Sequence, residues 1–411
     1  MDDERVRPRW SEDGRHARPG QAPRHAARTD SVTPFRDLDP AEYALPAGTR
    51  EKLLSPALVV YLDKVRENVQ RILAYAGTPD RWRPHIKTTK IPAVYSELIQ
   101  AGVRHFKCAT TREARVLLEV LEEAAVQDAD LLLAYPLRGP GLEVLAGLAR
   151  KHSTTRVSLL CEDPGLIDSI PQPLSIFVDV NPGMDRTGVP LADRDRLHAV
   201  VRGAGDRFRG IHYYDGHLHG PIEARQDEIF ACYDLALELC WELRELGFPP
   251  EEIITSGTPT FLHALAYPRF RELGNVVHRL SPGTVVFHDL RSEQENPDLH
   301  LTPAALLFTR VISRPRTDLA TCDVGSKSIA TEGEHVCAFV LGHAELEPQT
   351  PNEEHLPLRA VSAAAPDLGT ELMLVPHHVC PTVNLAEQVL LVDGEKIGTA
   401  VVTARAHDLL A

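Results

Sequence analysis

Short apolar runs alternate with stretches of helical periodicity from residue 56 to residue 289. Strands that alternate with helices are joined by crossover connections, so neighbouring strands run parallel. About eight such units over roughly 230 residues are enough to close a (β/α)8 TIM barrel. The pattern therefore predicts an α/β fold with a barrel as its main part. The runs expected as strands are LVVYL, WRPHIK, HFKCAT, DLLLAYP, RVSLLC, LSIFVDV, FRGIHYYDG, EEIITSG and HRLSPGTVVFHD.

The pattern changes after about residue 300, where strand-like runs follow one another without long helices. Asp393 and Gly394 stand between two alternating runs, a combination typical of a tight hairpin turn. We therefore predict the barrel over residues 37–298 and an antiparallel β domain over residues 299–411. The strand-like runs of this domain are LLFTRVISRP, LATCDVGS, CAFVLGHAEL, TELMLVP and EQVLLVDGEKIGTAVVTARA.

Residues 1–36 are rich in arginine, proline, histidine and aspartate and poor in apolar side chains. Such a composition cannot bury enough apolar surface to offset the entropy that is lost on ordering. We predict a disordered N-terminal extension, with a targeting or partner-binding role as the alternative.

Charge and cysteine usage exclude several classes of protein. With 58 acidic residues against 44 Lys and Arg, the formal net charge is -14, and no basic block outside the N-terminal extension could track a nucleic acid. The 7 cysteines lie far apart without a CxxC pair, which is typical of a reduced protein without disulfides. No apolar run approaches the roughly 20 residues that cross a bilayer, and a signal-peptide core is missing. We therefore predict a cytoplasmic protein that binds neither nucleic acid nor membrane.

A lysine stands at the end of an early barrel strand, in the segment RPHIKTTK of residues 83–90. Stability seldom requires a lysine at the inward tip of a strand. A cofactor that forms a Schiff base, in contrast, needs one amine in a pocket where desolvation lowers its basicity. Lys87 is therefore a candidate for this amine, and an ordinary loop lysine is the alternative.

An arginine stands between two glycines in VDVNPGMDRTG, residues 178–188. A strand that ends in such a tight turn can aim the guanidinium back at a ligand oxygen, because arginine stays charged and donates in a fixed fork. Arg186 would suit a phenolate partner. A turn arginine that pairs with a surface carboxylate is the alternative.

Small and hydroxyl-bearing residues follow two late barrel strands, in SGTP and in SPGT. Turns of this kind let backbone N–H groups approach a phosphate, and barrels often bind a phosphate at this position. Each motif alone is a weak signal, but two of them in successive units favour a phosphate site. Its candidate residues are Ser256, Gly257, Thr258, Gly283 and Thr284.

An imidazole and a thiol stand two residues apart in the predicted β domain, in PHHVCPT. On an extended segment, side chains two residues apart point to the same side. Together they favour a borderline metal such as zinc over a hard one. His378 and Cys380 are thus candidate ligands of an open metal site that water and substrate oxygens complete. An ordinary histidine and a buried cysteine are the alternative.

A second histidine pair, His217 and His219, follows a late strand in YDGHLHG. The HxH spacing could bind a metal in a hydrolase barrel, which makes a metal-dependent amidohydrolase a rival interpretation. Such barrels place the pair on the first strand, with a lysine or further histidines and an aspartate on later strands. Here the pair comes late, which argues against the rival.

Nine segments taken together resemble, in this order, the D-threonine aldolase and D-serine dehydratase family of fold-type III pyridoxal-phosphate (PLP) enzymes. The resemblance runs from about residue 56 to residue 405 and implies an alanine racemase-like barrel. The segments are RPHIKTTK, KCATTREA, VDVNPGMDRTG, YDGHLHG, SGTPTF, PGTVVFHD, CDVGSKS, NEEHLPL and PHHVCPTVNL.

The resemblance implies a role for most of the candidate residues. Lys87 forms the internal aldimine with PLP, Arg186 faces the phenolic oxygen, and Tyr214 lines the cofactor ring. The two Gly-Thr turns hold the phosphate, while His378 and Cys380 bind a divalent metal, either zinc or else manganese or magnesium. Lys87 and His378 are the expected catalytic residues. In the family, the β domain of one subunit closes the barrel mouth of another, so a head-to-tail homodimer is also implied.

The chain departs from the family at several positions. It has TTK where the family usually has THK, and Val285 where an aromatic residue follows PGT. His377 replaces an asparagine before the metal histidine. These departures bear on the shape of the substrate pocket more than on cofactor binding. The resemblance leaves the role of His355, in the EEH motif, open.

The resemblance implies a PLP- and metal-dependent lyase that acts on a D-3-hydroxy amino acid. Removal of the hydroxyl proton would cleave the Cα–Cβ bond to glycine and an aldehyde, as in a D-threonine aldolase. Removal of the Cα proton by Lys87 would instead expel hydroxide and give an α-keto acid with ammonia, as in a D-serine dehydratase. LLAYPLRGP and YDGHLHG favour the aldolase. An amino-acid racemase, which needs no metal, and a single-barrel PLP carrier are further alternatives.

Overall fold

The computed structural model describes residue 35 and residues 38–218, 222–332 and 336–410. Apart from Phe35, the N-terminal extension predicted to be disordered lies outside these residues, and so does His219. Phe35 is buried, and its ring meets the ring of His288 edge-on, with 5.8 Å between the centroids. Phe35 is therefore part of the packed structure, although it lies inside the segment predicted to be disordered.

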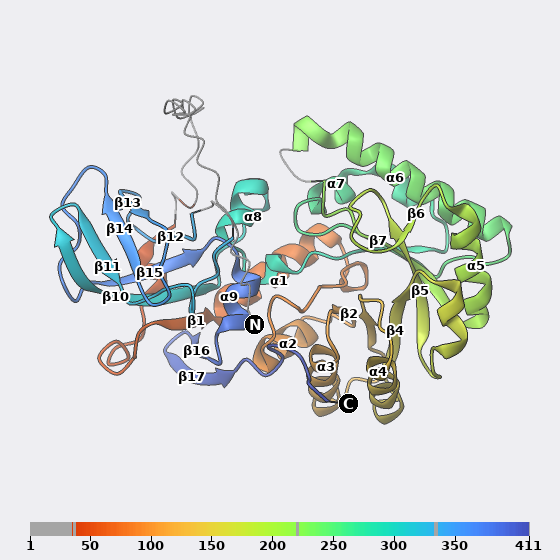
Figure 1. Cartoon of the computed structure of the whole chain (residues 1–411), viewed down its shortest axis with the longest axis horizontal. Coiled ribbons are helices and arrows are strands. Elements are labelled where there is room, and N and C mark those ends of the chain that lie inside the picture. Colours follow the sequence, from red (N-terminus) through yellow and green to blue (C-terminus); the bar gives the residue numbers. More distant parts are fainter. Residues whose placement is uncertain (1–34, 36–37, 219–221, 333–335, 411) are drawn as a thin grey trace, which may run out of the picture. The chain divides into compact units, whose positions relative to one another are not determined.

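Parallel strands in sequential order form the wall of the barrel (Figure 1). Each strand pairs with the next in parallel register, and the two-residue strand β6 (Val189–Pro190) adds a parallel pair to β5. The strands of this wall are β2 (His105–Cys108), β3 (Asp130–Leu133), β4 (Arg156–Cys161), β5 (Ser175–Asn181), β7 (Phe208–Tyr213), β8 (Glu252–Thr255) and β9 (Val277–Leu280).

The segment of residues 82–86 closes the barrel between its last and first wall strands. Trp82 forms a parallel bridge to Leu280 of β9, and His85 forms one to Lys107 of β2. The run WRPHIK, predicted as a strand, therefore takes the place of an eighth barrel strand. Because the segment ends at the rim, the lysine that follows it is carried to the barrel mouth.

The inward side chains of β3 show how the barrel interior is layered. Asp130, Leu132 and Ala134 alternate along the strand and so point to the same side. Asp130 belongs to a buried group of ion pairs at the amino ends of the strands. Leu132 packs with Leu160, Phe177 and Ile254 in an apolar layer. Ala134 lines a cavity at the carboxyl end. The apolar layer therefore separates an ionic floor from the functional end of the barrel.

Helices connect the strands of the barrel, and their apolar faces join the main core. Helix α3 begins with a capping arrangement, because Thr110 accepts from the backbone N–H of Glu113 at 3.0 Å while Glu113 accepts from Ala109 at 2.7 Å. Among the described residues, no helix is both long and apolar enough to cross a membrane. The helices are α1 (Leu62–Ala76), α2 (Pro92–Gln100), α3 (Thr111–Glu123), α4 (Pro140–Lys151), α5 (Arg194–Ala204), α6 (Ile222–Glu245), α7 (Phe261–Ala266) and α8 (Leu290–Glu295).

The run LVVYL, expected to open the barrel, lies in the other sheet instead. It forms β1 (Ala57–Tyr61), which pairs antiparallel with β10 (Ala305–Arg316) and parallel with β16 (Gln388–Asp393). Val59 and Tyr61 belong to a core cluster separate from the main one. A continuous apolar run shows that a strand is buried, but it does not specify which sheet buries it.

The second sheet is mainly antiparallel, as predicted for the C-terminal part of the chain (Figure 1). Its strands run in the order β13-β14-β11-β10-β1-β16-β17, and β15 joins β10 to β12. The predicted hairpin at Asp393 and Gly394 is confirmed, since Asp393 pairs with Lys396 across the turn between β16 and β17. The remaining strands are β11 (Leu319–Cys322), β12 (Ala338–Val340), β13 (Leu346–Pro348), β14 (Leu356–Ala360), β15 (Glu371–Pro376) and β17 (Lys396–Val401).

Candidate active site

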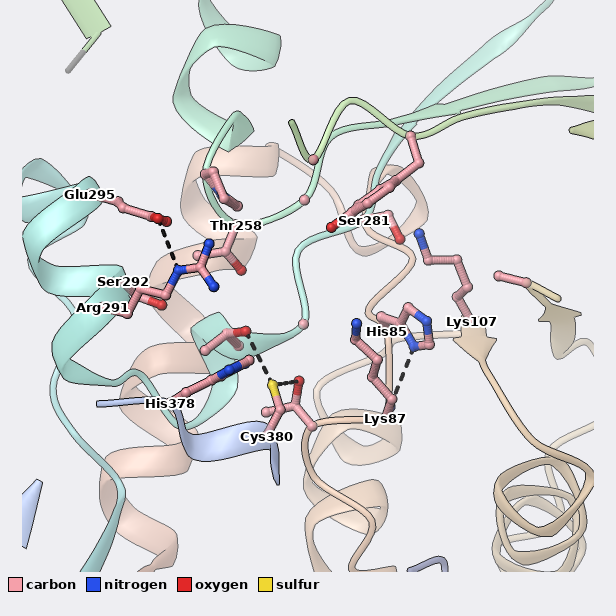
Figure 2. A pocket seen from close by; sticks show the side chains of 18 of the residues that line it. His85, Lys87, Lys107, Thr258, Ser281, Arg291, Ser292, Glu295, His378 and Cys380 are labelled. Carbon is pink, nitrogen blue, oxygen red and sulfur yellow. Dashed lines mark hydrogen bonds and ion pairs between the residues drawn. The ribbon is translucent and has the colours of Figure 1, made fainter. Parts of the chain in front are cut away.

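A cavity of about 270 Å³ lies where the barrel strands end (Figure 2). It is lined by residues that follow the closing segment, β3, β5, β7, β8 and β9, together with residues of α8 and of the predicted metal motif. The carboxyl ends of barrel strands are the usual place for an active site. The predicted site residues that line the cavity are Lys87, Arg186, Tyr214, Gly257, Thr258, Gly283, Thr284, His378 and Cys380.

Lys87 follows the closing segment, and its side chain points into the cavity (Figure 2). Its backbone N–H donates to His85 Nδ1 at 3.4 Å. Within the described ranges, no acceptor or carboxylate binds its amine. Burial lowers the pKa of His85 well below its ordinary value, and the charges of Lys87 and Lys107 lower it further, so this imidazole is neutral. An uncommitted amine beside a neutral imidazole can act as a nucleophile.

Tyr214 forms a flat wall of the cavity, and Arg186 lies against it. The guanidinium carbon of Arg186 is 4.8 Å from the centroid of the Tyr214 ring. A Cβ on Gly216 would collide with this ring, and a Cβ on Gly257 would come within 3.1 Å of it. A side chain at either position would therefore push against the Tyr214 ring, which lies close to two backbone turns.

His212 of β7 packs beside the ring of Tyr214, which follows the strand. Its ring lies nearly parallel to that of Tyr214, with 6.5 Å between centroids, and its Nδ1 is 2.8 Å from Asp179 Oδ1. Burial lowers the pKa of His212 although Asp179 acts in the opposite direction. We did not predict this pair from the sequence. The signal lies in the register, since Asp179 of β5 and His212 of β7 are direct neighbours across the sheet.

The two Gly-Thr turns, predicted to hold a phosphate, both line the cavity. A Cβ on Gly283 would collide with the carbonyl oxygen of His85, so only glycine lets the β9 turn approach the closing segment. Ser256, predicted with them, does not line the cavity; it is buried with φ +61. The serine therefore shapes the turn, while Gly257 and Thr258 face the cavity.

The predicted metal motif is a helix start and not the extended segment we expected. Helix α9 spans Val379–Leu385 and has His378 as its N-cap residue. Asp289 Oδ2 accepts from the backbone N–H of Val379 at 2.9 Å, and Asp289 Oδ1 caps α8 through Ser292 at 2.8 Å. One carboxylate thus caps two helices. It holds the motif against the barrel rim, where Cys380 lies in the first helical turn.

His378 and Cys380 form a hydrogen-bonded pair at the edge of the cavity. Burial disfavours both the protonated imidazole of His378 and the thiolate of Cys380. The hydrogen bond and the attraction between these two groups outweigh that effect. The pKa of His378 is raised to about 9, with help from Asp289 and Glu332, and the pKa of Cys380 is lowered. A lowered thiol pKa favours the thiolate, which is the form in which cysteine binds a metal.

Further contacts orient the two candidate ligands. His378 Nδ1 is 2.8 Å from Glu332 Oε1, and a carboxylate on one ring nitrogen commonly orients a metal-binding histidine. The hydroxyls of Thr88 and Thr284 lie 3.1 and 3.5 Å from Cys380 Sγ. In the part of the chain that the structure describes, no group of three His, Cys, Asp or Glu side chains could hold a metal ion. Of the described side chains, the candidate donors at this place are therefore the imidazole of His378 and the thiol of Cys380.

Two family models match the chain. The model of the alanine racemase N-terminal domain matches residues 60–287, which is more than half of the chain. The chain belongs to this family. A model of a serine dehydratase domain matches residues 304–392, in the predicted β domain. The resemblance found in the sequence and the alanine racemase-like fold are both confirmed.

This alanine racemase-like chain is similar to aldolases and dehydratases over nearly its whole length. The D-threonine aldolase of Arthrobacter sp is 27% identical over 369 residues, covering 85% of this chain and 92% of the relative. The D-threo-3-hydroxyaspartate dehydratase of Delftia sp. (strain HT23) is 24% identical over 380 residues, covering 83% and 95%. The crystal structure of D-threonine aldolase from Filomicrobium marinum superimposes with a TM-score of 0.74 at 27% identity, covering 86% of this chain and 96% of that one.

Two histidines singled out in the sequence lie away from the cavity. His217 of the rival pair does not line it, and His219 lies outside the described residues. His355 is exposed and does not line it either. Sequence reasoning missed several side chains that do line it, namely His85, Lys107, His212, Arg291 and Glu295. For Lys107, the available signal was a charged residue inside an otherwise apolar strand.

Proposed function

We propose that the chain is a PLP- and divalent-metal-dependent lyase that cleaves a D-3-hydroxy amino acid to glycine and an aldehyde. One observation carries the proposal: a single cavity contains the uncommitted amine of Lys87, two Gly-Thr turns and the His378–Cys380 pair. The similarity to D-threonine aldolases supports the aldol reaction. Aldol cleavage and dehydration are both known among the relatives, so the reaction type needs its own test.

The cavity has the parts needed to hold PLP. Lys87 would bind its aldehyde carbon, Tyr214 would contact the ring, and Arg186 would face the ring oxygen. The Gly257 and Gly283 turns line the cavity, and their backbone N–H groups would bind the phosphate. When bound, PLP supplies an electron sink for a bond at the substrate's Cα. The side chains that line the cavity would then determine which bond at the substrate's Cα is aligned for cleavage.

The His378–Cys380 pair would hold the metal. Zinc suits an imidazole and a thiolate best, and manganese or magnesium is the alternative. A cation bound there lowers the pKa of a hydroxyl that coordinates it. Glu332 would keep His378 oriented through its Nδ1. Because the pair lines the same cavity as Lys87, a hydroxyl on the substrate's Cβ can reach it.

The β-elimination of a D-serine dehydratase is the second candidate function. It differs in which proton leaves, because Lys87 would take the Cα proton and hydroxide would depart from Cβ. The match of a serine dehydratase domain model to residues 304–392 favours this candidate, as does the similarity to a D-threo-3-hydroxyaspartate dehydratase. The same cavity residues would serve both reactions, so product analysis separates them.

The deciding experiment incubates the full chain with PLP, a divalent metal and either D-threonine or D-serine. Glycine, aldehyde, keto acid and ammonia are then assayed separately. Glycine with acetaldehyde from D-threonine supports the aldolase, whereas pyruvate with ammonia from D-serine supports the dehydratase. Racemised substrate alone would contradict both. A purified protein without any PLP absorbance would revive the amidohydrolase interpretation.

Chelation of the metal should lower the lyase activity at least about a hundredfold, because a Lewis acid contributes several kcal/mol to such a reaction. Zinc or manganese should restore the activity. Cys380→Ala should bind metal poorly, while Cys337→Ala, which removes a buried cysteine outside the cavity, should bind it normally. Metal content by atomic spectroscopy checks this. Full activity after chelation would argue for a racemase.

Gly283→Ala should weaken PLP binding about tenfold or more. The new Cβ would collide with the backbone oxygen of His85, and overpacking of this kind costs about 1–3 kcal/mol. Fluorescence titration of the apoprotein with PLP measures the affinity. Gly147→Ala is the control, since a Cβ there meets nothing within 4 Å. Equal affinities of both variants would contradict the assignment of the β9 turn to the phosphate.

The head-to-tail homodimer also stays a prediction. Light scattering of the purified chain would test it, and a monomer at micromolar concentration would contradict it.

A further inference from the structure

A second lysine reaches into the cavity from β2. Lys107 is only 2% exposed, yet its side chain lines the cavity beside His85 (Figure 2). Its amine lies 5.6 Å from the centroid of the Tyr214 ring. Across the described ranges, no hydrogen-bond acceptor and no carboxylate pairs with this amine. A buried cation without a partner is costly, so a protein rarely retains one for stability alone.

The groups that face Lys107 are mostly cations. Lys87 follows the closing segment and Arg186 follows β5, while Asp215 follows β7. Asp215 is the one carboxylate named among these groups, but its oxygens already accept hydrogen bonds from Tyr233 at 2.7 Å and Thr260 at 2.8 Å. Lost hydration and the charge of Lys87 together lower the pKa of Lys107 to about 7, with further lowering by Arg83 and Arg186 and against the effect of Asp215.

Lys107 and Arg186 both lie close to the ring of Tyr214, and the charge of Arg186 acts on Lys107. Their charged groups lie 5.6 and 4.8 Å from the centroid of the same ring. The Gly-Thr turns that suit a phosphate belong to β8 and β9 instead. An anion between the two cations would therefore be a group other than the phosphate, attached to the part of the ligand that contacts Tyr214.

We propose that Lys107 is a cofactor-binding residue whose amine donates to the anionic ring oxygen of PLP, which Arg186 also faces. The inference rests on the proposed function. It explains why an unpaired amine is buried in the barrel: the ligand supplies the missing partner. A purely structural lysine would instead stabilise the protein before any ligand is bound.

The test compares Lys107→Met with the wild type in two measurements on the full chain. In the first, PLP is titrated into the apoprotein, and we expect the affinity to fall at least about tenfold because a charge-assisted hydrogen bond is lost. In the second, the unfolding temperature of the apoprotein is measured. We expect it to stay the same or rise, since the variant no longer buries an unpaired cation.

Lys64→Met is the matched control. Lys64 is also buried, at 4% exposure, and lies 4.6 Å from the centroid of the Tyr43 ring, but it pairs with Glu42 at 3.0 Å and is outside the cavity. Its loss should lower the stability of the apoprotein and leave PLP affinity unchanged. The two variants should therefore show opposite patterns.

The stability of the apoprotein should also depend on pH in a characteristic way. Because the pKa of Lys107 is about 7 in the folded state and near its ordinary 10.5 when unfolded, the unfolded chain binds more protons between these values. Wild-type stability relative to Lys107→Met should therefore rise as the pH increases from about 7 to 10. Below pH 7, the full penalty of the buried cation remains.

Each outcome decides something. If Lys107→Met binds PLP as tightly as the wild type, or if its apoprotein is less stable, the inference about Lys107 is overturned while the proposed function stands. If the wild type itself binds no PLP, both fail. Lys107→Gln is the second variant: a neutral donor at this position should recover part of the affinity, and wild-type affinity in this variant would exclude a role for the charge.

Discussion

Replacement of Lys87 by alanine should lower the lyase activity at least about a thousandfold and abolish covalent retention of PLP. A covalent catalyst that loses its nucleophile keeps only the contributions of binding and electrostatics. Lys87 is the residue expected to form the bond, because its amine points into the cavity and has no partner among the described residues. Borohydride reduction followed by peptide mass analysis should label the wild-type peptide that contains Lys87 and no peptide of the variant.

The control for this prediction is Lys90→Met. Lys90 stands only three residues further on, but it is buried, pairs with Glu113 and does not line the cavity. This variant should lose stability and keep the label on Lys87. Label on Lys107 in the wild type would show that the wrong lysine had been assigned, because both amines reach the same cavity.

The barrel was predictable because the alternation of strands and helices is a local property of the chain. A closed parallel barrel brings the ends of all its strands to one rim. Lys87, Arg186, Tyr214 and the two Gly-Thr turns each follow a strand, so their common location in one cavity follows from the fold. The individual motifs were weak, but the topology makes them converge.

The metal motif could not be placed by the same reasoning. His378 and Cys380 come from beyond the barrel, and the hydrogen bond from Val379 to Asp289 holds them at the rim. Such a contact between segments about 90 residues apart leaves no local pattern. The helix start at His378 was also missed, because valine, proline and threonine favour extended structure, whereas the Asp289 cap stabilises a helix there.

Strand β1 was predicted in the wrong sheet and Lys107 was missed, for different physical reasons. The run around Val59 is apolar throughout, so its sequence is compatible with either sheet. The pairing with Leu306 and Leu390 decides between them, and this pairing is a long-range property. Lys107 occupies an inward position of β2, where a charged residue contradicts the apolar pattern. Local rules fail most often at functional positions, which is consistent with a ligand role for this lysine.

The amino ends of the barrel strands contain a buried group of ion pairs below the apolar layer. Arg83 is fully buried and lies 2.8 Å from Asp130 and 2.7 Å from Glu252. Arg209 lies 2.7 Å from Asp130 and 3.2 Å from Glu252. Arg279 also pairs with Glu252. Each carboxylate therefore compensates more than one arginine, and the loss of either leaves the group with an excess of buried positive charge.

Glu252→Gln should lower the free energy of unfolding by about 3–5 kcal/mol, because it removes a buried carboxylate that Arg83, Arg209 and Arg279 share and leaves these cations with less negative charge than they need. Denaturant unfolding of the apoprotein measures this without a contribution from cofactor binding. Glu251→Gln is the control: Glu251 also pairs with Arg209, at 3.0 Å, but its side chain is 51% exposed, so we expect a change within about 1 kcal/mol. If both variants lose the same small amount of unfolding free energy, water must screen the buried ion pairs as much as it screens ion pairs on the surface. A large loss for Glu252→Gln alone would mean that the buried ion pairs stabilise the amino ends of the barrel strands. The carboxyl ends of the same strands form the cavity.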